Sequence, residues 1–438
     1  MRTRLIHLWE LLISSYWFVP GIMLLLSVLL AVLTLWIDSE FIDDEQKFAW
    51  FYTGGMAGAR EILSTIASAI MTVAAVIFSI TMLTLTQASA QFGPRLLRNF
   101  MRDFGNQFVM GLFIATFVYS LMVLRRIHDV EGEDFVPHLS MTISLILAVL
   151  SMCALVYFIH NISRSLQAPQ VVARVGHELI SAIDRVYPRH VGNDPRNIQP
   201  IDSPERGRDT RDGHVITANS TGYIQAIDQE GIIDIARDLD IIIRMQRRPG
   251  HFVTPSTPVA VVPDQQRNNG DLTARIRKLF IVGDERSAEQ DIEFSISQLV
   301  EIAVRSLSPS INDPFTAMTC LDWLAASIEA LLSKPPPSPY RYDDNGRLRV
   351  VTDMSDFEGV VDAAFNQIRQ NGINSLAVLI RLMEVLNRLA PQLHTEEQRR
   401  AIRRHLDQAM SEAKRLPLTE PDQSSVRRRY EQALEHLV

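Results

Sequence analysis

Long apolar runs without an ionisable side chain dominate the first 160 residues. Four of them approach or exceed the length of about 20 residues that a helix needs to cross a bilayer, and they are Tyr16–Ile37, Leu63–Thr86, Gln107–Leu124 and Leu139–Ile159. The first run has Tyr16 and Trp17 at one end and Trp36 at the other, where aromatic belts lie. Its apolar core is too long for a cleavable signal peptide. The pattern therefore predicts a four-span transmembrane domain over residues 1–160.

Basic residues mark one side of these runs. Arginines concentrate before the first run, between the second and third, and after the fourth, at Arg2, Arg4, Arg95, Arg98, Arg102, Arg164 and Arg174. The other two connections are acidic, "DSEFIDDEQK" and "HDVEGEDF". Because Lys and Arg accumulate in cytoplasmic loops, both termini are predicted to be cytoplasmic. The two cysteines, Cys153 and Cys320, offer no disulfide framework, which agrees with a reducing compartment for the C-terminal part.

The pattern changes after residue 161. A connecting helix and a flexible linker, poor in apolar residues, are predicted over residues 161–213. Short strand-like stretches ("HVITANSTGYIQAID", "IIIRMQ", "PVAVV"), one helix ("EGIIDIARDLD") and a turn at Pro249 and Gly250 predict a small β-rich module over 214–265. Residues 266–438 are mostly helical in pattern. The predicted fold is thus a membrane α-helical bundle of four N-terminal spans followed by a cytosolic α+β domain.

The helical region has recognisable boundaries. One apolar face is formed by Ile292, Ile296, Leu299, Ala303 and Leu307. Asn312 or Asp313 is suited to cap a helix whose first residue is Pro314, because a side-chain oxygen can accept a free backbone N–H and proline has none to lose. Further helices are predicted at about 356–371, 375–389, 395–416 and 424–438.

Charge and motifs exclude several functions. The net charge of -7 is spread along the chain with no basic face, so we exclude nucleic acid as a partner. The sequence has no G-x-x-x-x-G-K-[ST], G-x-G-x-x-G, H-E-x-x-H, G-x-S-x-G or C-x-x-C motif, and its eleven histidines are scattered. We therefore predict no catalytic residue, no metal site and no cofactor, and expect that the protein is not an enzyme.

One polar set in the helical region remains a candidate ligand or ion site. It comprises Asp291, Gln298, Glu301, Arg305, Asn312 and Asp313. The structural alternative is a salt-bridged face, with Glu301 four residues before Arg305, followed by a helix cap.

Several ordered stretches are recognisable together. They are "SAQFGPRLLRNF", "FIATFVYSLMVLR", "STGYIQAID", "RRPGHFV" and, most specific of all, "AVRSLSPSINDPFTAM". Over nearly its whole length the chain resembles a bacterial family of predicted integral membrane proteins known only as a domain of unknown function. The resemblance implies a multi-pass protein of the bacterial inner membrane. It implies no activity, substrate or catalytic residue.

The second apolar run carries a seam of hydroxyl side chains. Thr65, Thr72, Ser79 and Thr86 fall seven residues apart, and Ser68 lies between them on the same side. Such a seam allows close helix packing within the bundle. Alternatively, repeated around a symmetry axis, it lines a water-filled pore, and a ring of Glu61 at the outer end attracts cations.

Three functions follow from these features. The first is a homo-oligomeric channel or transport protein, with the second span at the axis and the cytosolic domain as regulator. A ring of Glu61 would make this channel prefer cations. The second is a non-conducting membrane sensor or scaffold, and the third is a membrane-anchored enzyme that uses the polar set. A channel predicts a symmetric oligomer with the second spans innermost. A scaffold predicts second spans that pack inside each protomer with no axial opening, and an enzyme predicts the polar set around a pocket.

Overall fold

The structure is a computed structural model that describes residues 17–41, 55–93, 104–127, 129–130, 133–134, 136–165, 167–186, 213–266, 270–335 and 338–437. It divides into two compact units, Met1–Gln170 and Val171–Val438. We call them the N-terminal unit and the C-terminal unit and describe each by itself.

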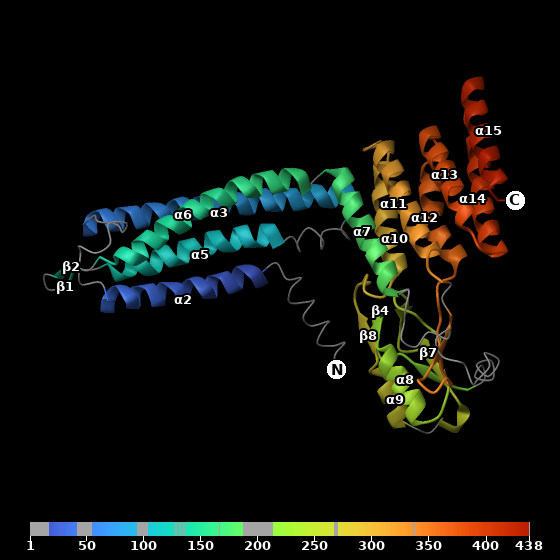
Figure 1. Ribbon diagram of the computed structural model, residues 1–438, viewed down its shortest axis with the longest axis horizontal. Helices are drawn as coiled ribbons and strands as arrows, with labels where there is room; N and C mark the ends of the chain where they lie inside the picture. Colours follow the sequence, from blue (N-terminus) through green and yellow to red (C-terminus); the bar gives the residue numbers. More distant parts are fainter. Residues whose placement is uncertain are drawn as a thin grey trace. The chain divides into compact units, whose positions relative to one another are not determined.

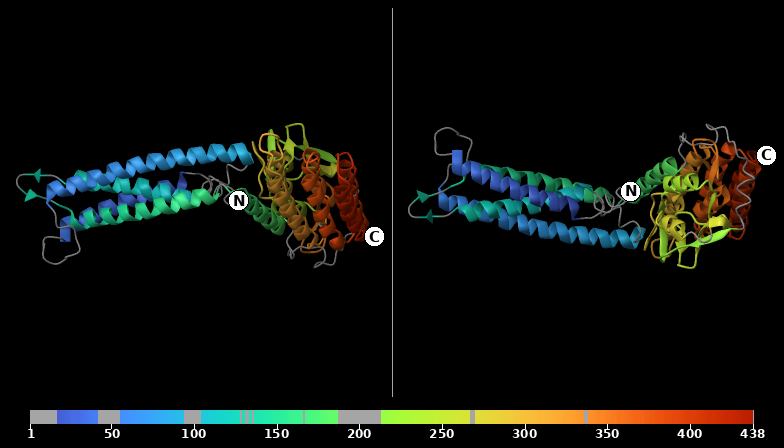
Figure 2. Two further views of the ribbon diagram at one scale, coloured as in Figure 1. Left: turned by 90° about the horizontal axis from the view of Figure 1, so that it is seen from above. Right: turned by 90° about the horizontal axis from the view of Figure 1, so that it is seen from below.

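The N-terminal unit consists of four long apolar helices and a small hairpin (Figure 1; Figure 2). The elements are α2 (Phe18–Phe41), α3 (Met56–Phe92), α5 (Phe104–Arg126), β1 (Asp129–Val130), β2 (Glu133–Asp134) and α6 (His138–Ser165). Each helix overlaps one predicted apolar run. Helix α2 extends beyond its run at the C-terminal end and the other three at both ends, because ionisable and polar residues end an apolar run without ending a helix. The 37 residues of α3 stop only at Gly93, whose φ of 104° favours glycine. At 1.5 Å per residue α3 is about 55 Å long.

Helix α5 is the centre of the N-terminal unit and packs against α2, α3 and α6. Of its most apolar 18-residue window 61% is buried, against 22% in each of the other three helices. Hydroxyls link it to its neighbours: Thr116 bonds Ser151 at 3.0 Å and Ser120 bonds Ser144 at 2.9 Å, both on α6. The hydrogen bonds described between side chains of different helices in this unit therefore involve α2, α5 and α6.

The last turn of α2 caps the beginning of α6. The buried Asp38 carboxylate accepts the backbone N–H groups of Leu139 and Ser140, each at 2.9 Å, and the Ser140 hydroxyl at 2.5 Å. A carboxylate at a helix N-terminus satisfies free donors and complements the helix dipole. Asp38 thus fixes α2 against α6.

The C-terminal unit contains two sheets. One has the strand order β3-β7-β5-β10-β9 and the other β6-β4-β8. The strands are β3 (His214–Thr217), β4 (Gly222–Ile227), β5 (Ile243–Met245), β6 (Phe252–Val253), β7 (Pro258–Val262), β8 (Phe280–Gly283), β9 (Tyr340–Tyr342) and β10 (Leu348–Val351). All pairs are antiparallel except β5 with β10. Short helices α8 (Gln229–Asp238), η3 (Asp264–Gln266) and α9 (Gly270–Arg277) connect strands.

The predicted strands and helix between residues 214 and 262 are present in the structure. The β-rich part nevertheless extends beyond the expected range of 214–265, because β8, β9 and β10 complete the sheets from later in the chain. Their pairing is long-range, and β10 covers the edge of β5 that a module ending at residue 265 leaves open.

Six helices form a layer beside the sheets and include the C-terminal end of the chain (Figure 1). They are α10 (Ile292–Ser306), α11 (Pro314–Leu332), α12 (Phe357–Asn371), α13 (Leu376–Leu389), α14 (Glu396–Ala413) and α15 (Glu420–Glu435), with the short η4 (Ala390–Gln392) between α13 and α14. The first residue of α15 precedes the predicted start at 424, because Pro421 is tolerated in the first turn of a helix.

Helix α11 is apolar enough to be counted among the possible membrane spans, although the sequence predicted four. Five described helices are long and apolar enough to cross a membrane, and α11 is the fifth. In the structure it packs against α10 and α13, with Leu321, Leu324 and Ile328 buried among them. Its apolar character therefore serves the core of the C-terminal unit.

Helix α7 (Ala168–Val186), within the predicted connecting segment, contacts α11 and the residue pair after it at two places. A Cβ built on Gly176 would lie 2.3 Å from the ring of Trp323, so only glycine permits this approach. Further along both helices, Lys334 pairs with Asp184. The linker predicted after α7 falls on residues 187–212, outside the described residues.

Candidate functional site

The outer face of α3 carries all six predicted pore-lining residues. Each is exposed, and together they form what we call the hydroxyl face: Glu61, Thr65, Ser68, Thr72, Ser79 and Thr86. The opposite stripe of α3 is buried against the bundle, with Ala59, Leu63, Ala67, Ile70 and Ile77 among its residues. The hydroxyl face therefore does not pack inside its own protomer.

Three hydroxyls of this face, those of Thr72, Ser79 and Thr86, donate to backbone carbonyls within α3. Thr72 Oγ1 donates to the carbonyl of Ser68 at 2.9 Å, and Ser79 Oγ donates to that of Ala75 at 3.0 Å. Each hydroxyl oxygen keeps lone pairs that can still accept a hydrogen bond from outside the helix. The face is thus polar toward its surroundings without requiring a neighbouring helix.

A groove of about 810 Å³ follows the hydroxyl face. One wall is the α3 stripe that includes Ser64, Ser68, Thr72 and Ser79, and the other is an apolar wall from α5, formed by Phe117, Leu121 and Leu124. Sequence analysis missed the α5 wall, because the periodicity of one helix does not reveal which residues of another lie beside it.

Glu61 lies near the N-terminal end of α3, about one turn after its first residue. The neighbouring Arg60 is directed elsewhere, with its guanidinium donating to the carbonyl of Ile127 at 2.9 Å. Glu61 is exposed and on the same side as the hydroxyls. A carboxylate therefore stands at one end of the hydroxyl face.

The polar set predicted in the C-terminal unit is divided between the two ends of α10. Asp291 caps α10, accepting the N–H of Phe294 at 3.1 Å, and Asp313 caps α11, accepting the N–H of Thr316 at 3.1 Å. The 15 residues of α10, about 22 Å, separate them. The set therefore does not converge on one cavity, and the predicted cap at Pro314 is confirmed with Asp313 as the capping residue.

The other members of the set have local roles. Glu301 and Arg305 form the predicted pair four residues apart, at 3.3 Å. Gln298 is buried within α10. Asn312 has a φ of 49°, the left-handed conformation that asparagine tolerates better than most residues.

The "RRPGHFV" stretch is fixed to the first turn of α10. Gly250 has a φ of 91°, and a Cβ there would lie 2.1 Å from Oδ2 of Asp291. Arg248 pairs with Glu293 at 2.8 Å, and Arg286 pairs with Asp291 at 2.6 Å. These contacts make the turn a structural clamp between the sheets and α10.

Burial and ion pairing act in opposite directions on the two clamp carboxylates. Burial raises the pKa of Asp291 above its ordinary value, and the Arg286 guanidinium only partly offsets it. Burial also acts to raise the pKa of Glu293, but the hydrogen bond from Ser355 and the charge of Arg248 outweigh it, so the net shift is downward. Both carboxylates are thus committed to partners within the protein.

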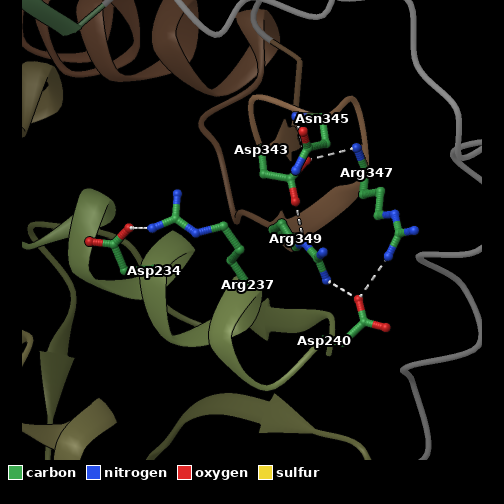
Figure 3. Close-up of polar contacts among 7 residues, drawn as sticks. All are labelled: Asp234, Arg237, Asp240, Asp343, Asn345, Arg347 and Arg349. Atoms are coloured by element: carbon green, nitrogen blue, oxygen red, sulfur yellow. Dashed lines mark hydrogen bonds and ion pairs between the residues drawn. The ribbon is translucent and has the colours of Figure 1, made fainter.

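A second ionic cluster joins the β9–β10 hairpin to the end of α8 (Figure 3). The buried Arg349 donates to Asp343 and to Asp240, each at 2.7 Å. Asp343 also accepts the backbone N–H groups of Asn345 and Arg347, each at 3.0 Å. Sequence analysis missed this cluster, although "DDNG" is a typical turn stretch. We call it the hairpin cluster.

No group of three or more His, Cys, Asp or Glu side chains is arranged to hold a metal ion within the described parts of the chain.

Comparison with known proteins adds the family. Residues 13–388 match the family described as "Predicted membrane protein (DUF2254)". The chain belongs to this family. It is 30% identical over 380 residues to the uncharacterized protein Mb1321c of Mycobacterium bovis and to the uncharacterized protein Rv1290c of Mycobacterium tuberculosis, covering 86% of this chain and 72% of each relative. No solved structure matches.

The family match confirms the resemblance inferred from the motifs. It includes the four apolar helices and all the described strands, and it ends within α13. The protein is accordingly a membrane protein with several apolar helices near its N-terminus and a β-containing C-terminal region.

Proposed function

We propose that the protein is a homo-oligomeric channel or transport protein of the bacterial inner membrane. In this proposal α2, α3, α5 and α6 span the bilayer, both termini are cytoplasmic, and the hydroxyl face of α3 lines the axis. The C-terminal unit is the cytosolic regulatory domain. Lipid, ions and further copies of the chain are its partners, and it acts without catalysis or a cofactor.

The observation that carries the proposal is the exposure of the hydroxyl face. A helix that used these side chains to pack its own bundle has to bury them, but the buried stripe of α3 is the opposite one. Elsewhere in the unit, hydroxyls that serve packing are buried and bonded between helices, as Thr116 and Ser151 are. A polar face left outside the protomer is what a pore formed by several protomers needs.

Glu61 extends the same argument to charge. A carboxylate at the end of the hydroxyl face becomes a ring when copies surround an axis, and a ring of like charge concentrates cations at the mouth. The proposal therefore favours a cation as the permeant species.

Two hydroxyls of α3 provide a matched pair for the flux test. Thr72 is exposed and Thr81 is buried, and each donates to the carbonyl four residues earlier, at 2.9 Å and 2.8 Å. Thr72→Val and Thr81→Val remove the same hydroxyl and keep the same shape. If the hydroxyl face lines water, Thr72→Val makes the pore easier to dewet and lowers ion flux per protein, whereas Thr81→Val leaves the flux unchanged.

The assay uses proteoliposomes loaded with a potassium- or sodium-sensitive dye, with an applied membrane potential. Glu61→Gln is the companion variant and is expected to reduce cation flux most at low ionic strength, where charge is least screened. Absence of flux from the unmodified protein across several ions would contradict the channel and favour the non-conducting sensor or scaffold.

Cross-linking tests the oligomer independently of conduction. In a Cys153→Ala background, a cysteine at Thr72 is expected to form a disulfide between copies, because equivalent residues approach one another at an axis. Val149 is an exposed apolar residue of α6 and serves as the control for lipid-facing positions. Cross-linking at Val149 but not at Thr72 would indicate that α6, and not α3, lies between copies, and would contradict the proposal.

A further inference from the structure

The loop between α10 and α11, together with the first turn of α11, presents two large apolar side chains to the outside. Phe315 is 74% exposed and Ile311 is 41% exposed. Among the described residues of the C-terminal unit, Val215 and Phe252 are the other exposed large apolar side chains, and both belong to strands. We call residues 307–315 the α10–α11 tip.

Hydrogen bonds within the tip satisfy part of its backbone. The N–H of Asn312 donates to the carbonyl of Ser308 at 2.8 Å, and that of Asp313 donates to the carbonyl of Ser306 at 2.7 Å. The N–H of Ile311 also donates to Ser308, at 3.1 Å. Internal bonding of this kind removes the main cost of moving a loop out of water.

The tip also carries little charge. Residues 306–312 contain no ionisable side chain. The Asp313 carboxylate is directed into the cap of α11, bonding the backbone and the hydroxyl of Thr316. Arg305, the nearest cation in the chain, pairs with Glu301. Attraction to the tip is therefore apolar rather than electrostatic.

The tip lies at the end of the C-terminal unit where the chain enters it. Helices α7 and α11 run in the same direction, with Gly176 against Trp323 and Asp184 against Lys334. On α7, the first residue, Ala168, lies eight residues before Gly176. On α11, Phe315 lies eight residues before Trp323. Both therefore lie about 12 Å from the first contact, in the same direction along their helices.

The beginning of α7 is tied to the last apolar helix. The apolar part of α6 ends at Ile162, and α7 begins at Ala168. A connection of six residues extends at most about 20 Å, so the beginning of α7 stays close to the end of α6.

We propose that the α10–α11 tip inserts Ile311 and Phe315 into the headgroup layer of the lipid bilayer. Exposed apolar side chains gain free energy in the interface without anionic lipid, so phosphatidylcholine serves as well as an anionic lipid. This rests on α6 spanning the membrane, as in the proposed function. The inserted tip gives the C-terminal unit a second attachment to the bilayer besides α7.

The test places a nitroxide on Ser310, which lies in the tip and leaves both apolar side chains intact. The full chain carries Cys153→Ala, while Cys320 is buried and burial raises the pKa of its thiol, so it does not react. In phosphatidylcholine proteoliposomes, the label at Ser310 is expected to be more accessible to oxygen than to a water-soluble nickel complex. With Ile311→Ser and Phe315→Ser introduced together, the preference is expected to reverse.

Two control labels separate this proposal from the proposed function. A label at the exposed Ser256, on the sheet side of the unit, is expected to prefer the nickel complex, and one at Val149 of α6 to prefer oxygen. Nickel preference at Ser310 with oxygen preference at Val149 would overturn the lipid contact and leave the span intact. Low accessibility to both reagents at Ser310, with spin–spin broadening relieved by unlabelled protein, would assign the tip to a second copy and also overturn the lipid contact.

Discussion

The hairpin cluster predicts a large and pH-dependent loss of stability when Asp343 is changed. Arg349 is only 6% exposed and Asp343 is fully buried, whereas the second partner, Asp240, is 63% exposed. Removing Asp343 therefore leaves a buried cation paired only with a solvated carboxylate.

The structure sets the expected magnitudes. Asp343→Ala removes one buried ion pair together with two backbone hydrogen bonds of the turn, and breaking a buried pair typically costs about 3 to 5 kcal/mol. Asp343→Asn keeps an oxygen for the two backbone N–H groups and loses the charge opposite Arg349. Its cost is expected to be about 1.5 to 3 kcal/mol, the range of a hydrogen bond to a charged group.

Cys320 gives an assay specific to the C-terminal unit. It is completely buried in α11, so a thiol reagent reaches it only when the unit opens. In the Cys153→Ala background, labelling of Cys320 against urea concentration yields the free energy of unfolding of this unit, without contributions from the N-terminal unit. The Asp343 variants are compared with the background protein by the shift of the labelling midpoint.

The pH dependence supplies the decisive comparison. Burial acts to raise the pKa of Asp343, but the Arg349 hydrogen bond and the turn N–H groups outweigh it and hold the pKa below its ordinary value. A depressed pKa adds stability at neutral pH, and this is lost as the pH falls below about 3.9, the unfolded value, and through the folded pKa. The cost of Asp343→Asn should therefore be equal at pH 7 and pH 5 and should shrink below about pH 4. A cost that stays constant down to pH 3 would refute the ionic account.

Four further substitutions, at three positions, test local geometry by the same Cys320 labelling. Gly176→Ala is expected to cost about 1 to 3 kcal/mol, because its Cβ overlaps the ring of Trp323, and an unchanged midpoint would contradict the close approach of α7. Gly250→Ala is expected to be at least as costly, since the added Cβ meets Asp291 and φ is positive. Asp313→Ala should cost about 1 kcal/mol and Asp313→Asn almost nothing, and equal losses would show that capping is not its role.

Local patterns predicted the elements of this protein well. The apolar runs located all four N-terminal helices, and short strand-like stretches located the strands around Ile224, Ile243 and Val261. Asp313 was among the residues expected to cap α11 because its preference acts through bonds to the next few residues. Signals that operate within one turn or one strand can be read directly from the sequence.

Relations between elements were largely beyond the sequence. The pairing of β5 with β10 joins residues about a hundred positions apart, and the hairpin cluster joins Asp240 to Arg349 across a similar separation. The predicted polar set likewise extends along α10 and beyond it, with Asp291 and Asp313 at opposite ends of that helix.

The division of labour within α3 has a consequence for how this family can diversify. One stripe of the helix is committed to holding the bundle together, while the other contributes little to the folding of its own protomer. Substitutions at positions such as Ser68 and Thr72 are therefore expected to change the properties of this surface more than the stability of the fold. The polarity of this surface can thus change by single substitutions while the helix bundle stays the same. Natural variation confined to this stripe would then reflect a change in what the surface contacts.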